Sequence, residues 1–460
     1  MDQEKLFISK LGSSASFINQ FDRETIQKNH LLNNENELNI LKNGIDLLNK
    51  YNPDLIHMPL SLSAEEIKDK KPIIKLIYTQ KIIRPWLEKE WITGKQLFHL
   101  GLKILEQQSI LIQNNSCFVD ARPDNYCLTT MQPKLVDLCS IKPLNKQNLM
   151  SFEFDFNNFI LNPLFLEKHL SIPISNYFQG KLYSCNINFF KVLNIWKSKT
   201  YLTELLKKYL IDSISNKISN SSPEFADYLN ETSTKDEIIP NYSYCKSILN
   251  KQIKLLKKVR PKEDINTNWD EYVDFHEREY NLKKIKLIEK FAKKHTKKTN
   301  IIDLGANLTS LDIKEIKIRV DQDPSITSSL WSSSKKGDIV MNLDIANSLC
   351  FPNENNFKAL NLYGTANAAV ITSLIHHLII DCGLSINQFF KSLSLLYEDI
   401  LLEFPTEDDP MVKLLKKKKN EFIQWSWQRD LLPICQKWFD ISNSIEISET
   451  RFIVELKAKK

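Results

Sequence analysis

The C-terminal half of the chain alternates two hydrophobic patterns. Apolar residues recur at helical spacing in residues 282–296 and 383–398, which predicts two amphipathic helices. Short apolar runs that end in turn or acidic residues predict buried strands at 300–305, 316–323, 338–344, 368–374 and 399–405. Segments 439–448 and 451–458 predict a terminal hairpin. The alternation indicates a parallel sheet with covered faces, to which the hairpin adds an antiparallel edge.

Two polar stretches divide the chain. Residues 215–243 are rich in Ser and Asn and residues 257–272 are rich in charge, so we expect loop and linker there. The sequence therefore predicts an N-terminal domain over 1–260 and an α/β domain over 265–460. A length of 460 residues agrees with this division, because one hydrophobic core seldom organises so long a chain.

Composition narrows the classes of protein. Lys and Arg number 62 against 56 Asp and Glu, and the basic residues are dispersed except for the run at 416–419. We expect that run to face solvent on a helix, and we expect no nucleic-acid partner. No apolar run approaches membrane-spanning length and the N-terminus lacks a signal-peptide pattern, so the prediction is a cytoplasmic chain. The eight Cys form no CxxC pair, which predicts reduced core residues.

The ends of the predicted strands carry candidate chemistry. Ligands of doubly wound sheets bind beyond the carboxyl ends of the strands, where strand order reverses. Asp303 and Gly305 close the first strand, and Asp321 and Asp323 close the second. Gly305 would let a ligand approach the backbone, Asp303 suits an ammonium group, and either later carboxylate could accept ribose hydroxyls. Taken alone, the stretch "DLGAN" is equally compatible with an ordinary turn.

Five segments in order make the pattern more specific. They are "DLGAN" (303–307), "VDQD" (320–323), "LDIAN" (343–347), "LIHHL" (374–378) and "LLEFPTEDDPMV" (401–412). In this order they resemble a bacterial class I S-adenosylmethionine-dependent methyltransferase family. The resemblance implies a Rossmann-like domain, mostly parallel with a closing antiparallel hairpin, that moves a methyl group from S-adenosylmethionine to an acceptor. The acceptor stays unidentified: a small molecule, a glycan and a protein are all compatible.

The same resemblance implies roles for individual residues. The methionine end of the cofactor would be lined by Asp303, Gly305 and Asn307, the ribose held by Asp321, and the adenine met by Asp344 and Ile345. His376 and His377 would lie near the methyl acceptor, where a histidine can act as general base. The alternative is that one of the two packs in the core. No metal is expected in this domain.

The cofactor loop departs from the family pattern in two ways. Thr309 stands where the family's loop has a glycine, and residues 310–316 are too few for its first helix. Both departures predict weakened cofactor binding, and they leave a decayed, non-catalytic binding protein as an alternative.

A second constellation lies in residues 117–141. Asp120 and Asn125 are five positions apart, and Asp137 follows after a turn and a β-like segment. This spacing resembles the protein kinase and aminoglycoside phosphotransferase superfamily. The resemblance implies an α+β kinase-like domain with a small lobe over 1–80 and a helical lobe over 81–260. Asp120 would accept the acceptor's proton, and Asn125 and Asp137 would hold magnesium on ATP.

Two further residues would complete that site, but one motif is missing. Lys28, in a hairpin over 12–28, would pair with phosphate, and Glu37 would be its helix partner. A glycine-rich loop is absent, since Gly12 stands alone. The methyltransferase family itself often carries an N-terminal region with segments like "DARPDN" and "VDLCSI". A non-catalytic nucleotide-binding or substrate-presenting scaffold, an active small-molecule phosphotransferase and a purely structural role therefore all stay open.

Overall fold

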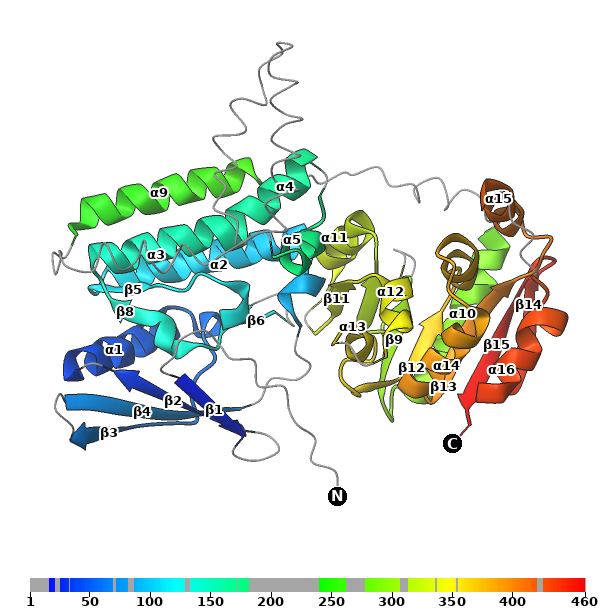
Figure 1. Ribbon diagram of the computed structural model, residues 1–460, viewed down its shortest axis with the longest axis horizontal. Helices are drawn as coiled ribbons and strands as arrows, with labels where there is room; N and C mark the ends of the chain where they lie inside the picture. Colours follow the sequence, from blue (N-terminus) through cyan, green and yellow to red (C-terminus); the bar gives the residue numbers. More distant parts are fainter. Residues whose placement is uncertain are drawn as a thin grey trace, which may run out of the picture. The chain divides into compact units, whose positions relative to one another are not determined.

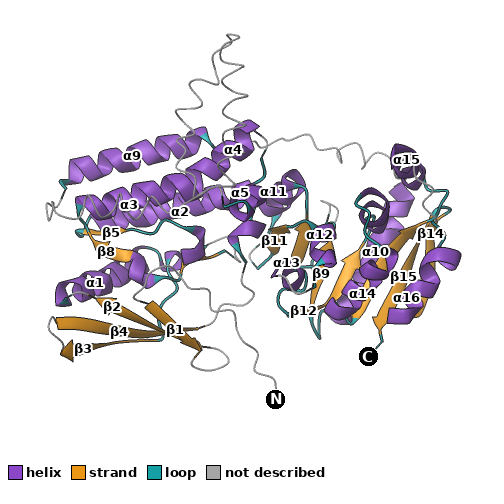
Figure 2. Cartoon of the chain, viewed as in Figure 1, coloured by secondary structure: helices purple, strands orange, loops and turns teal. Residues whose placement is uncertain are grey.

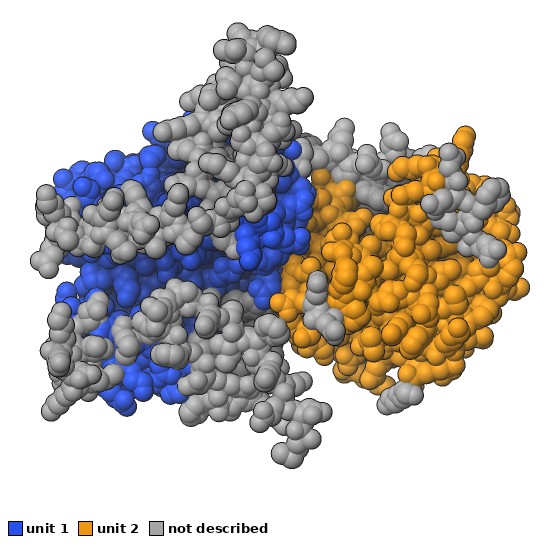
Figure 3. Space-filling model, in the orientation of Figure 1, with its two compact units in different colours: residues 1–90, 94–261 blue, residues 91–93, 262–460 orange. Residues whose placement is uncertain are grey.

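A computed structural model describes most of the chain, and its residues fall into two compact units. The described residues are 16–20, 25–32, 34–68, 72–81, 87–128, 133–170, 172–181, 240–261, 278–306, 313–335, 337–352, 355–419 and 425–459. Unit 1 comprises residues 1–90 and 94–261, and unit 2 comprises residues 91–93 and 262–460 (Figure 3). Both units combine helices with strands (Figure 2).

Unit 1 begins with an antiparallel sheet in the strand order β1-β2-β4-β3. Its strands are β1 (Ser16–Gln20), β2 (Thr25–Leu32), β3 (Ser61–Lys68) and β4 (Pro72–Lys81). β1 and β2 form the hairpin expected over 12–28. Helix α1 (Glu35–Tyr51) follows β2; the Asn34 side chain caps its N-terminus, and Leu38, Leu41, Ile45 and Leu48 form its buried face.

The remainder of unit 1 is mainly helical (Figure 1). Its helices are α2 (Gly94–Ile112), α3 (Lys146–Phe156), the π-helix η5 (Asn157–Leu161), α4 (Asn162–Leu170), α5 (Ile174–Gln179) and α9 (Tyr242–Lys258). Two short antiparallel pairs join them: β5 (Ser116–Phe118) with β8 (Ile141–Pro143), and β6 (Tyr126–Cys127) with β7 (Lys134–Leu135). Short 3-10 turns η1 to η4 lie at Pro53–Leu55, Lys89–Trp91, Pro123–Asn125 and Leu138–Ser140. α2, the longest of these described helices, packs against α9.

Unit 2 is built on a seven-stranded sheet in the order β11-β10-β9-β12-β13-β15-β14. The strands are β9 (Asn300–Leu304), β10 (Ile318–Asp321), β11 (Ile339–Asn342), β12 (Ala366–Ile371), β13 (Asp399–Pro405), β14 (Phe439–Ser448) and β15 (Arg451–Ala458). The first five pair in parallel, and β15 is antiparallel to both β13 and β14. This mixed, mostly parallel sheet is compatible with a Rossmann-like fold, and its strand order reverses between β9 and β12.

Along the chain, the first helix of unit 2 precedes β9, and the other described helices lie between the strands. In chain order the helices are α10 (Arg278–His295), α11 (Pro324–Ser333), α12 (Ile345–Cys350), α13 (Asn355–Ala359), the π-helix η9 (His377–Asp381), α14 (Ile386–Leu396), α15 (Pro410–Lys419), the π-helix η10 (Trp427–Leu431) and α16 (Leu432–Trp438). In the described part of the connection between β9 and β10, residues 305–306 and 313–317 contain no helix.

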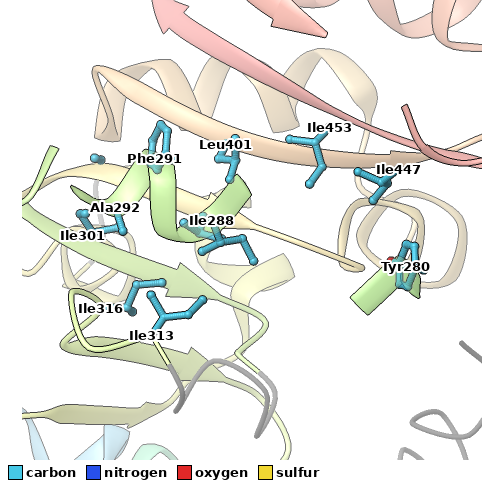
Figure 4. Packing of buried hydrophobic residues seen from close by; sticks show 12 residues of the cluster. Tyr280, Ile288, Phe291, Ala292, Ile301, Ile313, Ile316, Leu401, Ile447 and Ile453 are labelled. Carbon is cyan, nitrogen blue, oxygen red and sulfur yellow. The ribbon is translucent and has the colours of Figure 1, made fainter. Parts of the chain in front are cut away.

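One face of the sheet packs on α10 (Figure 4). Ile288, Phe291 and Ala292 of the helix belong to one buried cluster with Ile301 of β9 and Leu401 of β13. β11 and β12 read as nearly continuous buried runs, as expected for parallel strands covered on both faces. The hydrophobic pattern predicted this packing because both elements present apolar side chains to each other.

The structure also bears on the predictions for the basic run, the cysteines, the linker and membrane-spanning segments. The basic run lies at the end of α15, with residues 417–419 exposed as expected. The prediction that all cysteines are core residues is wrong, because Cys350 and Cys382 are exposed. Residues 257–258, assigned to a linker, instead end α9. None of the described helices is both long and apolar enough to span a bilayer.

Candidate functional site

The turn after β9 requires glycine for two reasons. Gly305 has φ +73, a left-handed conformation that residues with a side chain seldom adopt. A Cβ at this position would lie 3.0–3.2 Å from atoms of the Leu374 side chain. The backbone N–H groups of Gly305 and Ala306 both donate to the Val320 carbonyl, at 2.9 and 3.0 Å. The end of β9 is thus tied to β10 while its backbone turns sharply beside the loop after β12.

Two carboxylates lie together at the carboxyl ends of the first two strands. Asp303 is buried in β9, opposite Arg319 in the register of β10, and Asp321 is the last residue of β10 and partly exposed. The pKa of Asp321 is raised to about 7, chiefly by burial; the negative charges of Asp323 and Asp303 contribute to the rise, and backbone hydrogen bonds from Asp323 and Gln322 oppose it. A group that brings hydrogen-bond donors or positive charge would relieve this repulsion.

The other two acidic candidates in this region cap helices. Asp323 Oδ1 accepts from Ser325 N at 2.7 Å and so closes the N-terminus of α11. Asp344 accepts from Asn347 N at 3.0 Å and does the same for α12. Asp321 is therefore the better of the two ribose candidates that the pattern left open.

The turn that carries Asp321 is braced by Asn342, which sequence reasoning missed. Asn342 Nδ2 donates to the carbonyls of Asp321 at 3.4 Å and Gln322 at 3.1 Å, and to Thr327 Oγ1 at 3.3 Å. A lone asparagine closing the apolar strand "IVMN" was the available signal. Ile345, expected at the adenine, is buried at the start of α12. Asn307, Thr309 and Ser310 lie outside the described residues.

The two predicted catalytic histidines are buried at the start of η9, directly after the loop that follows β12. His376 is 0% exposed and His377 is 8% exposed, with ring centroids 4.2 Å apart. Neither ring nitrogen of His376 has a hydrogen-bond partner within the described part of the chain. Burial lowers the pKa of His376 well below its usual range, helped by His377, and lowers that of His377 to about 4. Both rings are buried, not one as the packing alternative expected, and both are neutral at pH 7.

A buried ionic network lies beside the histidines. Arg451 Nη1 donates to Glu403 Oε1 at 2.9 Å, and Arg451 Nε donates to Asp409 Oδ2 at 2.6 Å. Lys284 Nζ lies 3.0 Å from Glu403 Oε2, and Tyr280 OH donates to Glu403 Oε1. Burial alone would raise the pKa of Glu403, but Lys284 and Arg451 hold it well below its usual range. Two cations and two carboxylates cancel inside this network.

The network also fixes the loop after β12. Ser373 has φ +52, and its backbone N–H and hydroxyl donate to Glu403 Oε2 at 3.1 and 3.2 Å. Lys284 Nζ donates to Ser373 Oγ at 3.0 Å. Because Ser373 precedes the Leu374 that packs on Gly305, the network positions one wall of the cofactor candidate site. Glu403 is thus a structural carboxylate at the strand end.

In unit 1 the structure brings together the three residues of the second constellation. Asn125 Nδ2 donates to the Asp120 carbonyl at 2.8 Å, and the Asn125 carbonyl accepts from Val136 N and Asp137 N at 2.9 and 3.4 Å. Burial raises the pKa of Asp120 to about 6; Arg122 opposes this, and Asp155 and Asp137 add to it. A carboxyl that titrates near neutrality is suited to accepting a proton.

Lys28 reaches the same loop from β2. Its buried Nζ donates to the Val136 carbonyl at 2.9 Å. Burial lowers the pKa of Lys28, and the negative charge of Asp137 opposes that shift. The predicted pairing of Lys28 with Glu37 is not what the structure has: Glu37 lies 3.9 Å from Lys142 Nζ, whereas Lys28 is engaged by the backbone beside Asp137.

Arg122 and Asp155 hold the loop from the helical side, and sequence reasoning did not single them out. Arg122 Nε donates to Asp155 Oδ2 at 2.8 Å, and Nη2 lies 3.3 Å from Oδ1. The guanidinium also lies 5.1 Å from the centre of the Phe159 ring. This two-point pairing orients the chain between Asp120 and Asn125.

Comparisons with known proteins add little to this geometry. No model of a known protein family matches the chain, and no curated protein matches it. Among solved structures, the PH0226 protein from Pyrococcus horikoshii OT3 is 15% identical, with a TM-score of 0.28, over 40% of this chain and 94% of that chain. A TM-score this low does not establish a shared fold. Across the described residues, no three His, Cys, Asp or Glu side chains are grouped to hold a metal ion.

Proposed function

We propose that unit 2 binds S-adenosylmethionine at the ends of β9 and β10 and transfers its methyl group to an acceptor. The observation that carries this proposal is the meeting of Asp303 and Asp321 beside the Gly305 turn, at the point where strand order reverses. The resemblance of the five segments to class I methyltransferases supports the same assignment.

The residues present fit this cofactor. A ribose offers two hydroxyl donors, which suit the Asp321 carboxylate, and the amino group of the methionine end would offset the charge of Asp303. Gly305 has no side chain in the way of a ligand. The bound cofactor supplies an electrophilic methyl group, and the chain's contribution is to orient cofactor and acceptor. The roles of Asn307, Asp344 and Ile345 stay predictions.

The histidines would act on the acceptor's side. Neutral His376 and His377 can accept a hydrogen bond or a proton, but a pKa near 4 for His377 makes it a weak base at pH 7. Because His376 is 0% exposed and His377 is 8% exposed, an acceptor amine or hydroxyl could reach these rings only if the surrounding side chains moved aside, and the low basicity of the rings would limit deprotonation.

Calorimetry on the full chain tests this proposal. Wild type should give a binding heat with S-adenosylmethionine, and Asp321→Asn should weaken the affinity about tenfold, because a hydrogen bond to a charged group is lost. Asp399→Asn is the matched control: this carboxylate is the first residue of β13, so it lies at the amino ends of the parallel strands, and it is paired with His295. No heat with wild type at millimolar cofactor would contradict the proposal.

A second candidate function, for unit 1, is binding of a magnesium nucleotide. The observation that favours it is the convergence of Lys28, Asn125 and Asp137 beside an Asp120 carboxyl whose pKa is about 6. Asn125 and Asp137 would hold the cation of Mg-ATP, and Asp120 would serve as general base if phosphate is transferred.

Substitution of Asp137 separates this function from a purely structural role. Asp137→Ala should weaken Mg-ADP binding at least tenfold, since a carboxylate ligand to the cation is removed. Asp46→Ala, on the exposed face of α1, should leave the affinity unchanged. Equal affinities in the two variants would remove this candidate, and nucleotide-dependent phosphate release would distinguish a phosphotransferase from a binding scaffold.

A further inference from the structure

Ser140 links the side chains of the two candidate cation ligands in unit 1. It ends the turn η4 and is 0% exposed. Its hydroxyl accepts from Asn125 Nδ2 at 3.3 Å and donates to Asp137 Oδ2 at 3.1 Å. A serine hydroxyl has one proton to donate and can accept at the same time, so both bonds can form together.

The hydrogen bonds of Asn125 decide which way its amide points. The Asp120 carbonyl can only accept, so the Asn125 atom 2.8 Å away must be the amide nitrogen. The contact with Ser140 uses the same nitrogen. Oδ1 of Asn125 is therefore the atom left to face a ligand, and an amide oxygen is a suitable donor to a hard cation.

We propose that Ser140 is a positioning residue that sets Asn125 Oδ1 and the Asp137 carboxylate as a pair for the divalent cation that accompanies the nucleotide. This inference rests on the nucleotide site proposed for unit 1. It adds a residue that neither touches the nucleotide nor ligates the cation, and that acts through both ligands at once.

The backbone around the pair is already fixed without this hydroxyl. Val136 N and Asp137 N donate to the Asn125 carbonyl, Lys28 holds the Val136 carbonyl, and Val119 N donates to the Ser140 carbonyl at 2.9 Å. Loss of the hydroxyl would thus free the side chains of Asn125 and Asp137, while the backbone keeps its conformation. Cation affinity should change far more than metal-free nucleotide affinity or stability.

The test uses the full chain, Mn²⁺ as the probe ion and ADP as the nucleotide. Ser140→Ala should weaken Mn²⁺ binding in the presence of ADP about tenfold, since hydrogen bonds that order two ligands are lost. The affinity for ADP without metal should stay within about twofold of wild type. Electron paramagnetic resonance counts bound Mn²⁺, and calorimetry measures ADP alone.

Ser116→Ala is the matched control, because Ser116 is also a buried serine of unit 1 and its hydroxyl donates to the Leu111 carbonyl at 3.0 Å. It should leave Mn²⁺ affinity unchanged. If wild type binds Mn²⁺–ADP and the two alanine variants behave alike, the positioning role is wrong while the nucleotide site stands.

The failure of the nucleotide site itself would look different. In that case wild type would bind neither ADP nor Mn²⁺ with ADP, and both proposals would fall. If Ser140→Ala does not fold, Ser140→Cys, which is close in size but a weaker donor and acceptor, replaces it. It should weaken Mn²⁺ binding severalfold, and wild-type affinity in that variant would overturn the inference.

Discussion

The pKa values of two carboxyl groups, one in each unit, are shifted in opposite directions. In unit 2, Glu403 meets Lys284 and Arg451, which hold its pKa well below its usual range despite burial. In unit 1, Asp120 is crowded by Asp155 and Asp137, and burial raises its pKa to about 6. The first carboxylate is paired with cations within the fold, whereas burial of the second outweighs the opposing charge of Arg122 and leaves a carboxyl that binds a proton readily. The difference separates carboxylates that hold the structure from those available for chemistry.

Asp321 shows that this distinction is local and does not follow the division into units. It lies in the same sheet as Glu403, yet its neighbours Asp323 and Asp303 are acidic and its pKa rises to about 7. Unit 2 therefore contains both kinds: a closed ionic network under the loop after β12 and an acidic pair at the ends of β9 and β10.

The largest expected effect comes from opening the closed network. Arg451→Met leaves Glu403 with Lys284 as its cation and Asp409 without its guanidinium, so unfolding free energy should fall by about 3–5 kcal/mol. Urea denaturation measures this loss. Arg429→Met, which removes an exposed guanidinium paired with Asp430, should cost far less, because an ion pair open to solvent contributes little. A similar small loss for both variants would show that the network does not stabilise unit 2.

An intermediate effect is expected at the cofactor turn. Gly383→Ala places a Cβ at φ +74 in open space and should cost about 1–2 kcal/mol through backbone strain alone. Gly305→Ala has nearly the same φ, +73, and also presses on Leu374, so it should cost about 1 kcal/mol more. Thermal unfolding compares the two. Equal losses would mean that Leu374 yields freely, and the wall it forms would not be fixed.

The smallest effect is a pH dependence of stability. The pKa of Asp321 is about 7 in the folded chain against an ordinary value near 3.8, so the native state binds the proton more tightly. Its ionisation costs stability as pH rises between these values, and the cost is complete above pH 7. Asp321→Asn should therefore exceed wild type in stability at pH 8, by on the order of 1 kcal/mol, and match it near pH 3.

A variant at the amino ends of the parallel strands completes that measurement. Asp399→Asn removes a carboxylate paired with His295 and should gain no stability at pH 8. Unfolding curves of wild type, Asp321→Asn and Asp399→Asn at pH 3, 6 and 8 measure this pH dependence of stability. A loss of stability in Asp321→Asn at pH 8 would show that Asp321 is already compensated in the folded chain.

Local patterns predicted the architecture of unit 2 but only part of its site. Apolar runs and the acidic residues in or beside them located β9, β10 and β13. Parallel strands that are buried on both faces appear in the sequence as continuous apolar runs, so each can be recognised from a short segment. Asp323 precedes Pro324, a helix-start signature that would have separated it from Asp321. Glu403 and Arg451 could not be paired from the sequence, since only the antiparallel insertion of β15 beside β13 brings them together.

The site in unit 1 shows the same limit. The spacing of Asp120, Asn125 and Asp137 was readable because one short segment of the sequence carries all three. The partner of Glu37 was not, because Lys142 lies on β8, far along the chain. Ser140 also lies within the segment that carries the motif, but its role depends on side-chain hydrogen bonds that spacing does not reveal.

Hydrogen exchange on the full chain tests most directly the claim that the two carboxyls of raised pKa, Asp120 and Asp321, mark two ligand sites. S-adenosylhomocysteine should slow exchange at residues 301–306 and 318–323 and leave residues 118–137 unchanged. Mg-ADP should protect 118–137 and leave the ends of β9 and β10 unchanged. Protection at neither place by either ligand would contradict the account.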